Sequence, residues 1–366
     1  MKNLRLLVLS TDYPNNKGGL ALAYVRTRNV YYLGQGAKVD VINFSTDVEY
    51  TIDDISVHTK EWFSTEKASS YDLLICHAPN LRNHYKFLLK YGNLFQKKVF
   101  FFHGHEVLKI NKVYSKPYSF LPTNKIKNLF QNTYDDIKLL IWRKYFENNY
   151  NTSYCIFVSN WMKDEFYKWT KLQEHVLTNR EFITYNSVGE IFEKELWNKG
   201  KTKEYDYITI RAYLDGSKYS VDIVNNLAWN NPDKKFLLIG QGEFFNHYKK
   251  APNITWIAKR LNHKEMCEFL DLSKCALMPT RTDAQGVMMC EMAAYGMPLI
   301  TSDIPVCHEV FDGMTGIGYI DNEDYRSCDI NDIYKSIKDG ASKNPRYFYS
   351  IVGEQEFGIL NTIAEK

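Results

Sequence analysis

The sequence predicts an α/β protein of two doubly wound parallel-sheet domains, and three observations predict this fold class. The chain has 366 residues, which is more than one hydrophobic core usually serves. Short apolar runs typical of buried strands alternate with segments of helical spacing, and this alternation indicates parallel sheets. A polar, charged interval at residues 193–205 separates two such series and is the best linker candidate.

The strands of the first series are expected before that interval. They are Leu4–Ser10, Val39–Phe44, Leu73–Cys76, Val99–Phe102, Tyr154–Val158 and Phe182–Tyr185. The strands of the second series follow the interval, at Tyr207–Ile210, Phe236–Ile239, Ile254–Trp256, Ala276–Met278, Pro298–Ile300 and Gly318–Ile320. We therefore expect Rossmann-like domains over residues 1–192 and 193–343. Ligands of open α/β sheets bind beyond the carboxyl ends of the strands, so the loops there should face one another across a central cleft.

Composition and charge exclude several classes of protein. The hydrophobic and charged fractions, 45% and 24%, are those of a soluble globular protein, and no run approaches the roughly eighteen apolar residues of a membrane span. The apolar run Leu6–Leu9 is not followed by a signal-peptide cleavage site, so we interpret it as a strand and expect a cytoplasmic protein. A net charge of +3 is too small to indicate nucleic acid. The seven scattered cysteines form no C-x-x-C pair, which argues against a disulfide framework or a zinc site.

Two loops of the first half carry candidate site residues. Gly18 and Gly19 precede a segment of helical spacing, and glycines at a helix start let backbone N–H groups approach an anion; an ordinary glycine turn explains them equally well. His103 follows the strand Val99–Phe102, where an imidazole can donate to a hydroxyl or phosphate near neutral pH. A His-x-His pair is nevertheless more often structural than catalytic. Neither loop has the G-x-G-x-x-G pattern, which disfavours a dehydrogenase.

Loops of the second half carry basic residues and glycines. Arg211 follows the strand Tyr207–Ile210, and Lys218 precedes the next helix. A planar guanidinium and a point charge together can neutralise a diphosphate, whereas the simpler interpretation of Lys218 is a solvated charge beside a helix. Gly240 and Gly242 permit a tight turn beside a ligand, which is a weak signal by itself.

The stretch from Pro279 to Asp303 carries the strongest signal. Gly286 precedes an apolar helix, whose first N–H groups and positive dipole end would hold a phosphate. Glu291 lies within that helix among apolar neighbours, and a buried carboxylate needs partners with hydroxyl or N–H groups, such as the two hydroxyls of a ribose. The alternative is that the Glu291 side chain points to solvent. The presence of Asp283 and Gly286 nearby makes this the weaker interpretation.

These residues resemble glycosyltransferase family 4, a retaining family of the GT-B fold. The family's mark is an acidic residue, seven intervening positions and a glutamate, which Asp283 and Glu291 match, followed by a strand of the A-x-G-x-P-[VL]-I type at Ala294–Ile300. The family commonly has glutamate where this chain has Asp283. The other segments that resemble family elements, in family order, are Gly18-Gly19, His103, Asn186, Arg211 with Lys218, and Gly240 with Gly242. The resemblance covers essentially the whole chain.

The resemblance implies a role for each of these residues. Glu291 would hold the ribose of a nucleotide-diphosphate sugar, Asp283 the sugar hydroxyls, and His103 the sugar or an acceptor hydroxyl. The diphosphate would be bound by Arg211, Lys218 and the backbone at Gly19, Gly286 and Val287. The remaining substrate-binding residues would be Gly18, Asn186, Gly240, Gly242, Gln285 and Met288. His103, Asp283, Arg211 and Lys218 would act in catalysis.

The resemblance also implies a reaction. A hexosyl unit would pass from a UDP- or GDP-linked sugar to a hydroxyl of a saccharide or polyprenyl-linked acceptor, in the synthesis of bacterial cell-surface polysaccharide. Cations and N–H groups would stabilise the leaving diphosphate, so neither a metal ion nor another cofactor is expected. The first domain would bind the acceptor and the second the nucleotide sugar, while residues 344–366 would cross back to the first. The alternatives are a nucleotide-sugar epimerase and a non-catalytic sugar-nucleotide-binding partner.

Basic and aromatic residues are mixed at residues 84–91 and between residues 125 and 146. Such stretches are typical of helices on an anionic membrane surface, which would suit a polyprenyl-linked acceptor at the inner face of the cell membrane. They are as typical of amphipathic helices that cover a sheet. Both interpretations stay open on the sequence alone.

Overall fold

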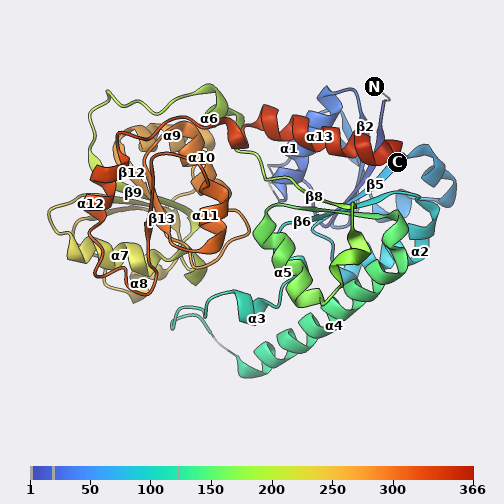
Figure 1. The fold of residues 1–366 in the computed structure, drawn as a ribbon, viewed down its shortest axis with the longest axis horizontal. Helices are drawn as coiled ribbons and strands as arrows, with labels where there is room; N and C mark the ends of the chain where they lie inside the picture. The colour runs from blue at the N-terminus through green and yellow to red at the C-terminus, as the bar shows by residue number, and fades with distance from the viewer. Residues whose placement is uncertain (1–2, 19–20, 123) are drawn as a thin grey trace. The chain divides into compact units, whose positions relative to one another are not determined.

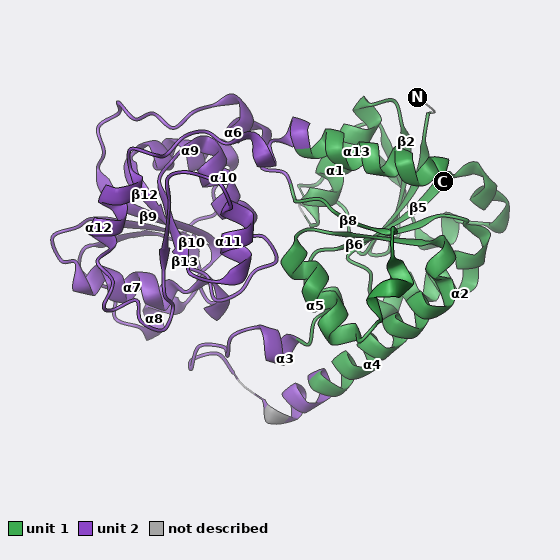
Figure 2. Ribbon diagram, in the orientation of Figure 1, with its two compact units in different colours: residues 1–109, 132–186, 352–366 green, residues 110–131, 187–351 purple. Residues whose placement is uncertain are grey.

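The computed structural model describes residues 3–18, 21–122 and 124–366. The chain divides into two compact units (Figure 2). Unit 1 comprises Met1–Lys109, Asn132–Asn186 and Val352–Lys366, and unit 2 comprises Ile110–Gln131 and Ser187–Ile351. Each unit contains one sheet with helices on its faces (Figure 1). The predicted fold class, two parallel-sheet α/β domains, is therefore confirmed.

In the described part of unit 1, eight strands form one sheet in the order β3-β4-β2-β1-β5-β6-β7-β8. They are β1 Arg5–Ser10, β2 Lys38–Asn43, β3 Tyr50–Ile52, β4 Ile55–His58, β5 Leu73–His77, β6 Lys98–Phe102, β7 Ser153–Phe157 and β8 Glu181–Ile183. Neighbouring strands are parallel except β3 and β4. Every residue of β5, β6 and β7 is buried, as expected for parallel strands that are covered on both faces.

Helices of several lengths cover the sheet of unit 1. They are α1 Ala23–Gly34, α2 Lys86–Tyr91, α4 Lys125–Asn149, α5 Asn160–Thr170 and α13 Tyr349–Glu365, with the short 3-10 segments η1 Lys60–Trp62, η2 Thr65–Ser70, η4 Gly92–Leu94, η5 His105–Val107, η6 Tyr150–Thr152 and η7 Glu174–Leu177. One π-helical turn, η3 Leu81–Tyr85, continues directly into α2. The first residues of α4 are counted with unit 2 and the remainder with unit 1.

The C-terminal helix α13 is held in the core of unit 1. Phe357, Leu360 and Ile363 pack in the same apolar cluster as the strands β1 and β2. The buried Glu356 accepts hydrogen bonds from Arg28 at 3.0 Å, from Tyr32 and from Thr184. The burial of apolar side chains and the hydrogen bonds of a buried carboxylate thus hold α13 in unit 1, although α13 is far in sequence from the rest of that unit.

In the described part of unit 2, six parallel strands form a sheet in the order β11-β10-β9-β12-β13-β14. They are β9 Tyr205–Tyr213, β10 Phe236–Gln241, β11 Ile254–Ile257, β12 Ser273–Leu277, β13 Leu299–Ser302 and β14 Ile317–Ile320. Its helices are α3 Ile110–Val113, α6 Glu190–Lys194, α7 Val221–Asn230, α8 Phe244–His247, α9 His263–Asp271, α10 Val287–Tyr295, α11 Pro305–Phe311 and α12 Ile330–Ile337, with η8 Ser217–Tyr219 and η9 Pro345–Tyr347.

The division of the chain differs from the expected boundaries at residues 192 and 343. Residues 110–131 are counted with unit 2, because Tyr118 donates to Asp222 at 2.8 Å and packs in the core of that unit. The interval expected as a linker is also attached there, since the backbone N–H of Trp197 donates to Tyr295 and its indole N–H to Leu270.

Each sheet has one point at which the strand order reverses. In unit 1, β1 lies between β2 and β5, and in unit 2, β9 lies between β10 and β12. Crevices form beyond the carboxyl ends of the strands at such points, because the neighbouring connections leave toward opposite sides. The loops after β1 and β5, and those after β9 and β12, are thus where each unit should bind a ligand.

Candidate functional site

Arg211 is a charged residue near the carboxyl end of β9, the strand at which the order of the sheet in unit 2 reverses. It lies in β9, its side chain is buried, and its Nη2 donates to the carbonyl of Pro279, which follows β12, at 2.7 Å. Burial lowers the pKa of the Arg211 guanidinium from its usual value, while the nearby Asp283 opposes that shift; the group stays charged. Its buried Nε has no hydrogen-bond partner among the described residues. An anion at this edge would satisfy that donor.

Lys218 is fixed in place by the loop that follows β12. The carbonyl of Lys218 accepts from the backbone N–H of Arg281 at 2.8 Å and from the hydroxyl of Thr280 at 3.0 Å. Arg281 in turn forms a two-bond ion pair with Asp222, at 2.9 and 2.7 Å, and donates to the carbonyl of Ser217. The two loops at the reversal point are thereby joined. The charged groups of Arg211 and Lys218 both lie near the ring of Tyr219, at 5.1 and 4.7 Å from its centre.

Gly240 and Gly242 bring the loop after β10 close to the loop after β9. A Cβ on Gly240 would lie 2.4 Å from the carbonyl oxygen of Arg211, a distance that backbone cannot accommodate. A Cβ on Gly242 would lie 2.7 Å from the carboxylate of Asp215, which accepts the N–H of Glu243 at 2.8 Å. These glycines are required for this close approach, whether or not they also contact a ligand.

Gly286 precedes α10 with a left-handed backbone, φ 76°. Its carbonyl accepts from the N–H groups of Met289 and Cys290, whereas the N–H groups of Val287 and Met288 lie in the first turn, where the helix itself supplies no acceptor. A Cβ at Gly286 would lie 2.1 Å from the Met289 side chain, so a larger residue would strain or displace the turn. The start of α10 therefore presents N–H donors and a positive dipole end at the carboxyl end of β12.

Glu291 lies just over one turn into α10 and is 5% exposed. The prediction of a buried rather than solvated carboxylate agrees with its position. Its Oε1 lies 3.2 Å from Nε2 of His263, the first residue of α9. That hydrogen bond raises the pKa of His263 above its usual value. The side chain of His263 is half exposed, so a ligand hydroxyl can compete for Glu291 from the solvent side.

Asp283 and Gln285 occupy the turn between β12 and α10. Asp283 is partly buried and accepts the N–H of Ala284 at 2.8 Å, so its side chain is held by its own turn. Gln285 is buried, and its amide lies 3.7 Å from the sulfur of Cys290. Both side chains belong to the same turn as Gly286, as the sequence spacing predicts.

The candidate residues of unit 1 gather around buried histidines. His103 Nε2 lies 3.3 Å from Nδ1 of His77, and its ring lies 4.4 Å from that of Tyr24. Burial holds the pKa of His103 well below its usual range, although a hydrogen bond with Asn186 acts in the opposite direction. Asn186 also accepts from Arg28 at 3.0 Å. His103 is therefore a neutral donor or acceptor near neutral pH.

The predicted glycine loop is described only in part. Gly18 is exposed and has φ 88°, which suits glycine at the turn after β1. Gly19 lies outside the described residues. In the part of the chain that the structure describes, no group of three or more His, Cys, Asp or Glu side chains is arranged to hold a metal ion.

Part of unit 2 is similar in sequence to a known family. Residues 209–329 match the family described as "Glycosyl transferases group 1", and this segment contains Arg211, Lys218, Gly286 and Glu291. No protein of curated function matches the chain in sequence.

Solved structures share the fold of this chain at low sequence identity. A sucrose-phosphate synthase from Thermosynechococcus elongatus is 12% identical with a TM-score of 0.68, over 98% of this chain and 99% of that one. A glycosyltransferase from Rickettsia africae is 14% identical with a TM-score of 0.66, over 99% of each chain. HepE from Anabaena, solved with UDP and glucose, is 11% identical with a TM-score of 0.64, over 98% and 100%. The predicted GT-B fold is confirmed.

Three residues that support the site were not found from the sequence. Arg281 joins the loops that carry Lys218 and Pro279, His263 pairs with Glu291, and Arg28 holds Asn186. Each acts on a residue far away in the chain, so no local spacing indicates its partner. The sequence offered little signal: Arg281 lies five residues before Gly286, whereas His263 has no glycine within twenty residues.

Proposed function

We propose that the protein transfers a hexosyl unit from a nucleotide-diphosphate sugar to a hydroxyl of a saccharide or lipid-linked acceptor. One observation carries the proposal: within the segment that matches this family, Arg211, Lys218 and the first turn of α10 meet at the reversal point of the sheet, with Glu291 buried just beyond. Cations and N–H donors there suit a diphosphate, and a buried carboxylate suits a pair of ribose hydroxyls.

The chemistry follows from the charge that develops during sugar transfer. The departing diphosphate gains negative charge. Donors that are already oriented would stabilise this charge, namely Arg211, Lys218 and the N–H groups of Val287 and Met288. We infer a retaining transfer that requires no metal ion, with Asp283 at the sugar hydroxyls and His103 at the sugar or acceptor. A neutral His103 can accept a hydrogen bond from a hydroxyl without repelling the donor's anomeric centre as charge develops there.

The cellular setting belongs to the same proposal. We infer synthesis of cell-surface polysaccharide in the cytoplasm, at the inner face of the membrane. Among the described residues, no helix is long and apolar enough to cross a membrane. Helix α4 nevertheless exposes Ile126, Leu129 and Phe130 at 66%, 67% and 71%, and Ile137 and Leu140 at 51% and 48%. Such a helix fits peripheral contact with a lipid surface that carries the acceptor.

A nucleotide screen tests the proposal. UDP, GDP and ADP, and their sugar conjugates, should be added to the protein in a thermal-shift assay, because a ligand at a hundred times its dissociation constant adds about 2.7 kcal/mol to the free energy of unfolding. Transfer by the nucleotide sugar that binds, followed by nuclear magnetic resonance of the product's anomeric carbon, then reports the stereochemistry. No shift with any nucleotide would refute the proposal, and a strict need for manganese would refute its metal-free form.

A further inference from the structure

A basic pocket lies wholly within unit 1, at the carboxyl ends of its strands. Its volume is about 940 Å³. Thr11 follows β1, Phe44 follows β2 and Asn80 follows β5, and all three line it. These strands include β1 and β5, between which the order of the sheet reverses. The pocket therefore occupies the position at which an open α/β sheet binds its ligand.

Three cations stand along one side of this pocket. Arg82, Lys86 and Lys90 follow one another at four-residue intervals along η3 and α2 and so share one helical face. All three side chains are exposed, and among the described residues no carboxylate forms an ion pair with them. Like charges four residues apart on a helix repel one another and destabilise it slightly. Lys90 lies over the ring of Tyr91 at 4.7 Å, but no carboxylate in the described part of the chain compensates the repulsion among the three cations, and an anionic ligand would.

Aromatic rings also line the pocket, two of them from α2 itself. The ring of Phe63 lies 5.1 Å from Phe87 and 5.0 Å from Tyr91. Hydrogen bonds fix the polar floor, since Asn80 Nδ2 donates to the hydroxyl of Thr11 at 2.6 Å. Aromatic area with a few oriented polar groups is typical of a small-molecule site. The pocket thus combines an apolar wall, a fixed polar floor and a row of cations.

We propose that this basic pocket binds the acceptor of the transfer reaction, and that the acceptor carries an anionic group, a phosphate or a carboxylate, which Arg82, Lys86 and Lys90 bind. The assignment as acceptor rests on the proposed glycosyl transfer. Arginine offers two parallel N–H donors to such a group and each lysine a point charge. The aromatic wall is left to contact the apolar face of the sugar ring or the start of a lipid chain.

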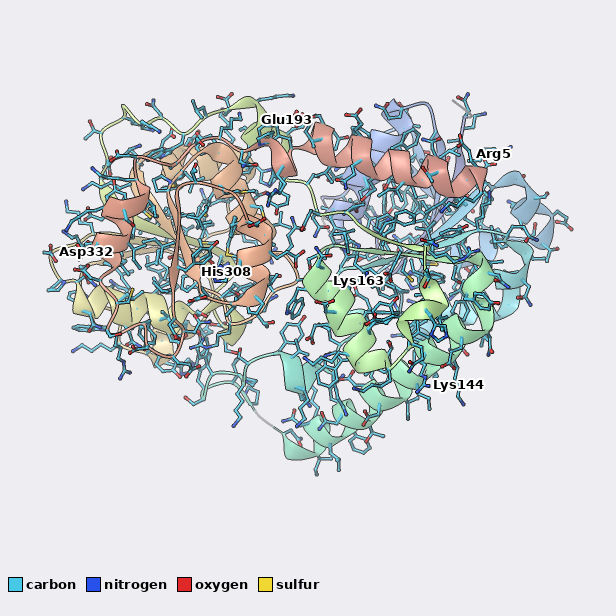
Figure 3. The ribbon with its side chains drawn as sticks, viewed as in Figure 1. Arg5, Lys144, Lys163, Glu193, His308 and Asp332 are labelled. Carbon is cyan, nitrogen blue, oxygen red and sulfur yellow. The ribbon has the colours of Figure 1, made fainter. Side chains whose placement is uncertain are left out.

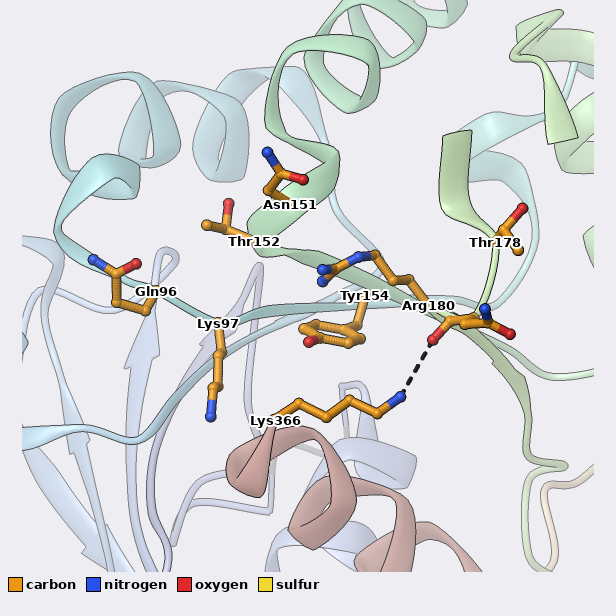
Figure 4. A pocket seen from close by; sticks show the side chains of 9 residues that line it. Gln96, Lys97, Asn151, Thr152, Tyr154, Thr178, Arg180 and Lys366 are labelled. Carbon is orange, nitrogen blue, oxygen red and sulfur yellow. Dashed lines mark hydrogen bonds between the residues drawn. The ribbon is translucent and has the colours of Figure 1, made fainter. Parts of the chain in front are cut away.

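Another basic pocket of unit 1 does not carry the same inference. It lies at the amino ends of β6, β7 and β8 and includes Lys97, Arg180 and Lys366 (Figure 4). Two of these cations are engaged with backbone: Lys97 donates to the carbonyl of Ala364, and Lys366 to that of Asn179. Arg180 stacks on the ring of Tyr154. Ligands of open α/β sheets bind at the opposite edge.

Binding of small probes tests the proposal without a known acceptor. Glucose, glucose 6-phosphate and glucuronic acid should be titrated into the full chain and followed by ligand-observed nuclear magnetic resonance. We expect at least one charged probe to bind at least tenfold more tightly than glucose. A triple variant of the pocket should lose that preference; its changes are Arg82→Gln, Lys86→Gln and Lys90→Gln. A control variant that removes the same amount of charge elsewhere should keep it; its changes are Lys38→Gln, Lys144→Gln and Lys201→Gln.

The outcomes separate this inference from the proposed function. Tighter binding of glucose 6-phosphate supports a phosphorylated acceptor, and tighter binding of glucuronic acid supports a carboxylated one. Equal binding of all three probes, an unchanged triple variant, or an equal loss in the control would overturn the inference. The nucleotide shift should be measured on the same variants and should persist in all of them. Its absence from the wild type would refute glycosyl transfer, not anion binding at this pocket.

Discussion

At the scale of single residues, Glu291 is the side chain on which nucleotide binding should depend most. A charged hydrogen-bond acceptor contributes roughly 1.5–3 kcal/mol per bond, so Glu291→Gln should weaken binding of the nucleotide by about tenfold to a hundredfold, and Glu291→Ala should abolish transfer. Neither change should unfold unit 2, because His263 is half exposed and keeps access to water. Isothermal titration with the nucleotide found in the screen measures the effect, and unchanged affinity would refute the ribose assignment.

His263 should make the same binding step depend on pH. Its pKa is raised by Glu291, so the protonated pair is most stable at low pH and weakens as pH rises through that pKa. A ribose must displace His263 from Glu291, and we therefore expect tighter nucleotide binding at pH 8 than at pH 6. The variant His263→Gln should bind with an affinity that no longer changes over this range. The matched control is His175→Gln, an exposed residue of η7 in unit 1.

Sequence spacing predicts some of these residues and not others for a physical reason. Gly286 and Glu291 lie in one short segment. The end of a strand and the start of a helix fix their positions there, so local sequence is enough to predict them. His263 reaches Glu291 only because the tertiary structure brings the start of α9 close to α10. Partners of this kind depend on the packing of elements that are distant in sequence, and no local pattern encodes them.

At the scale of elements, the local sequence predicts the long strands and does not predict the short ones. The apolar runs of β1 and β6 are sufficient to predict strands, because near-continuous apolar runs are typical of parallel strands that are buried on both faces. The hairpin of β3 and β4 was missed, since its strands have three and four residues. Its turn places Asp53 and Asp54 at φ 51° and 62°, the left-handed pair of a tight hairpin.

Helix α4 buries some of its aromatic residues and exposes others. Trp142, Tyr145 and Phe146 near its end are buried in unit 1, so this section covers the sheet. Ile126, Phe130 and Ile137, at intervals of four and seven residues, are exposed and share one side of the helix. Lys144, labelled in Figure 3, is also exposed and continues the same side. The interpretation as a sheet-covering helix therefore holds for the end of α4, and membrane contact of its exposed section stays a prediction.

The exposed section of α4 should bind anionic vesicles. Each large apolar side chain that inserts contributes about 1.5–3 kcal/mol, so Leu129→Ser with Phe130→Ser should reduce partitioning onto phosphatidylglycerol vesicles at least tenfold. Co-sedimentation measures the bound fraction. The control Val48→Ser with Leu196→Ser removes two comparably exposed side chains, 70% and 59%, outside α4. Equal loss in the two variants would contradict a role for this helix.

At the scale of the whole molecule, buried histidines should set how stability depends on pH. In unit 1, burial lowers the pKa of His84 to about 4 and holds those of His77 and His103 well below the usual value. Below pH about 6.5 these histidines bind protons in the unfolded chain but stay neutral in the folded protein. The free energy of unfolding of unit 1 should therefore fall by about 1.4 kcal/mol per pH unit for each such histidine.

Unit 2 should respond in the opposite direction through His263. Its folded pKa is raised, so its contribution to stability is present below the unfolded value and is lost as pH rises. Hydrogen exchange at pH 7, 6 and 5, read separately for amides of the two sheets after correction for intrinsic rates, would resolve the two trends. His84→Gln should reduce the slope in unit 1, and His175→Gln should leave it unchanged. A stability of unit 1 that stays flat or rises toward pH 5 would show that these histidines accept protons in the folded protein, which would also remove the neutral His103 that the proposed transfer requires.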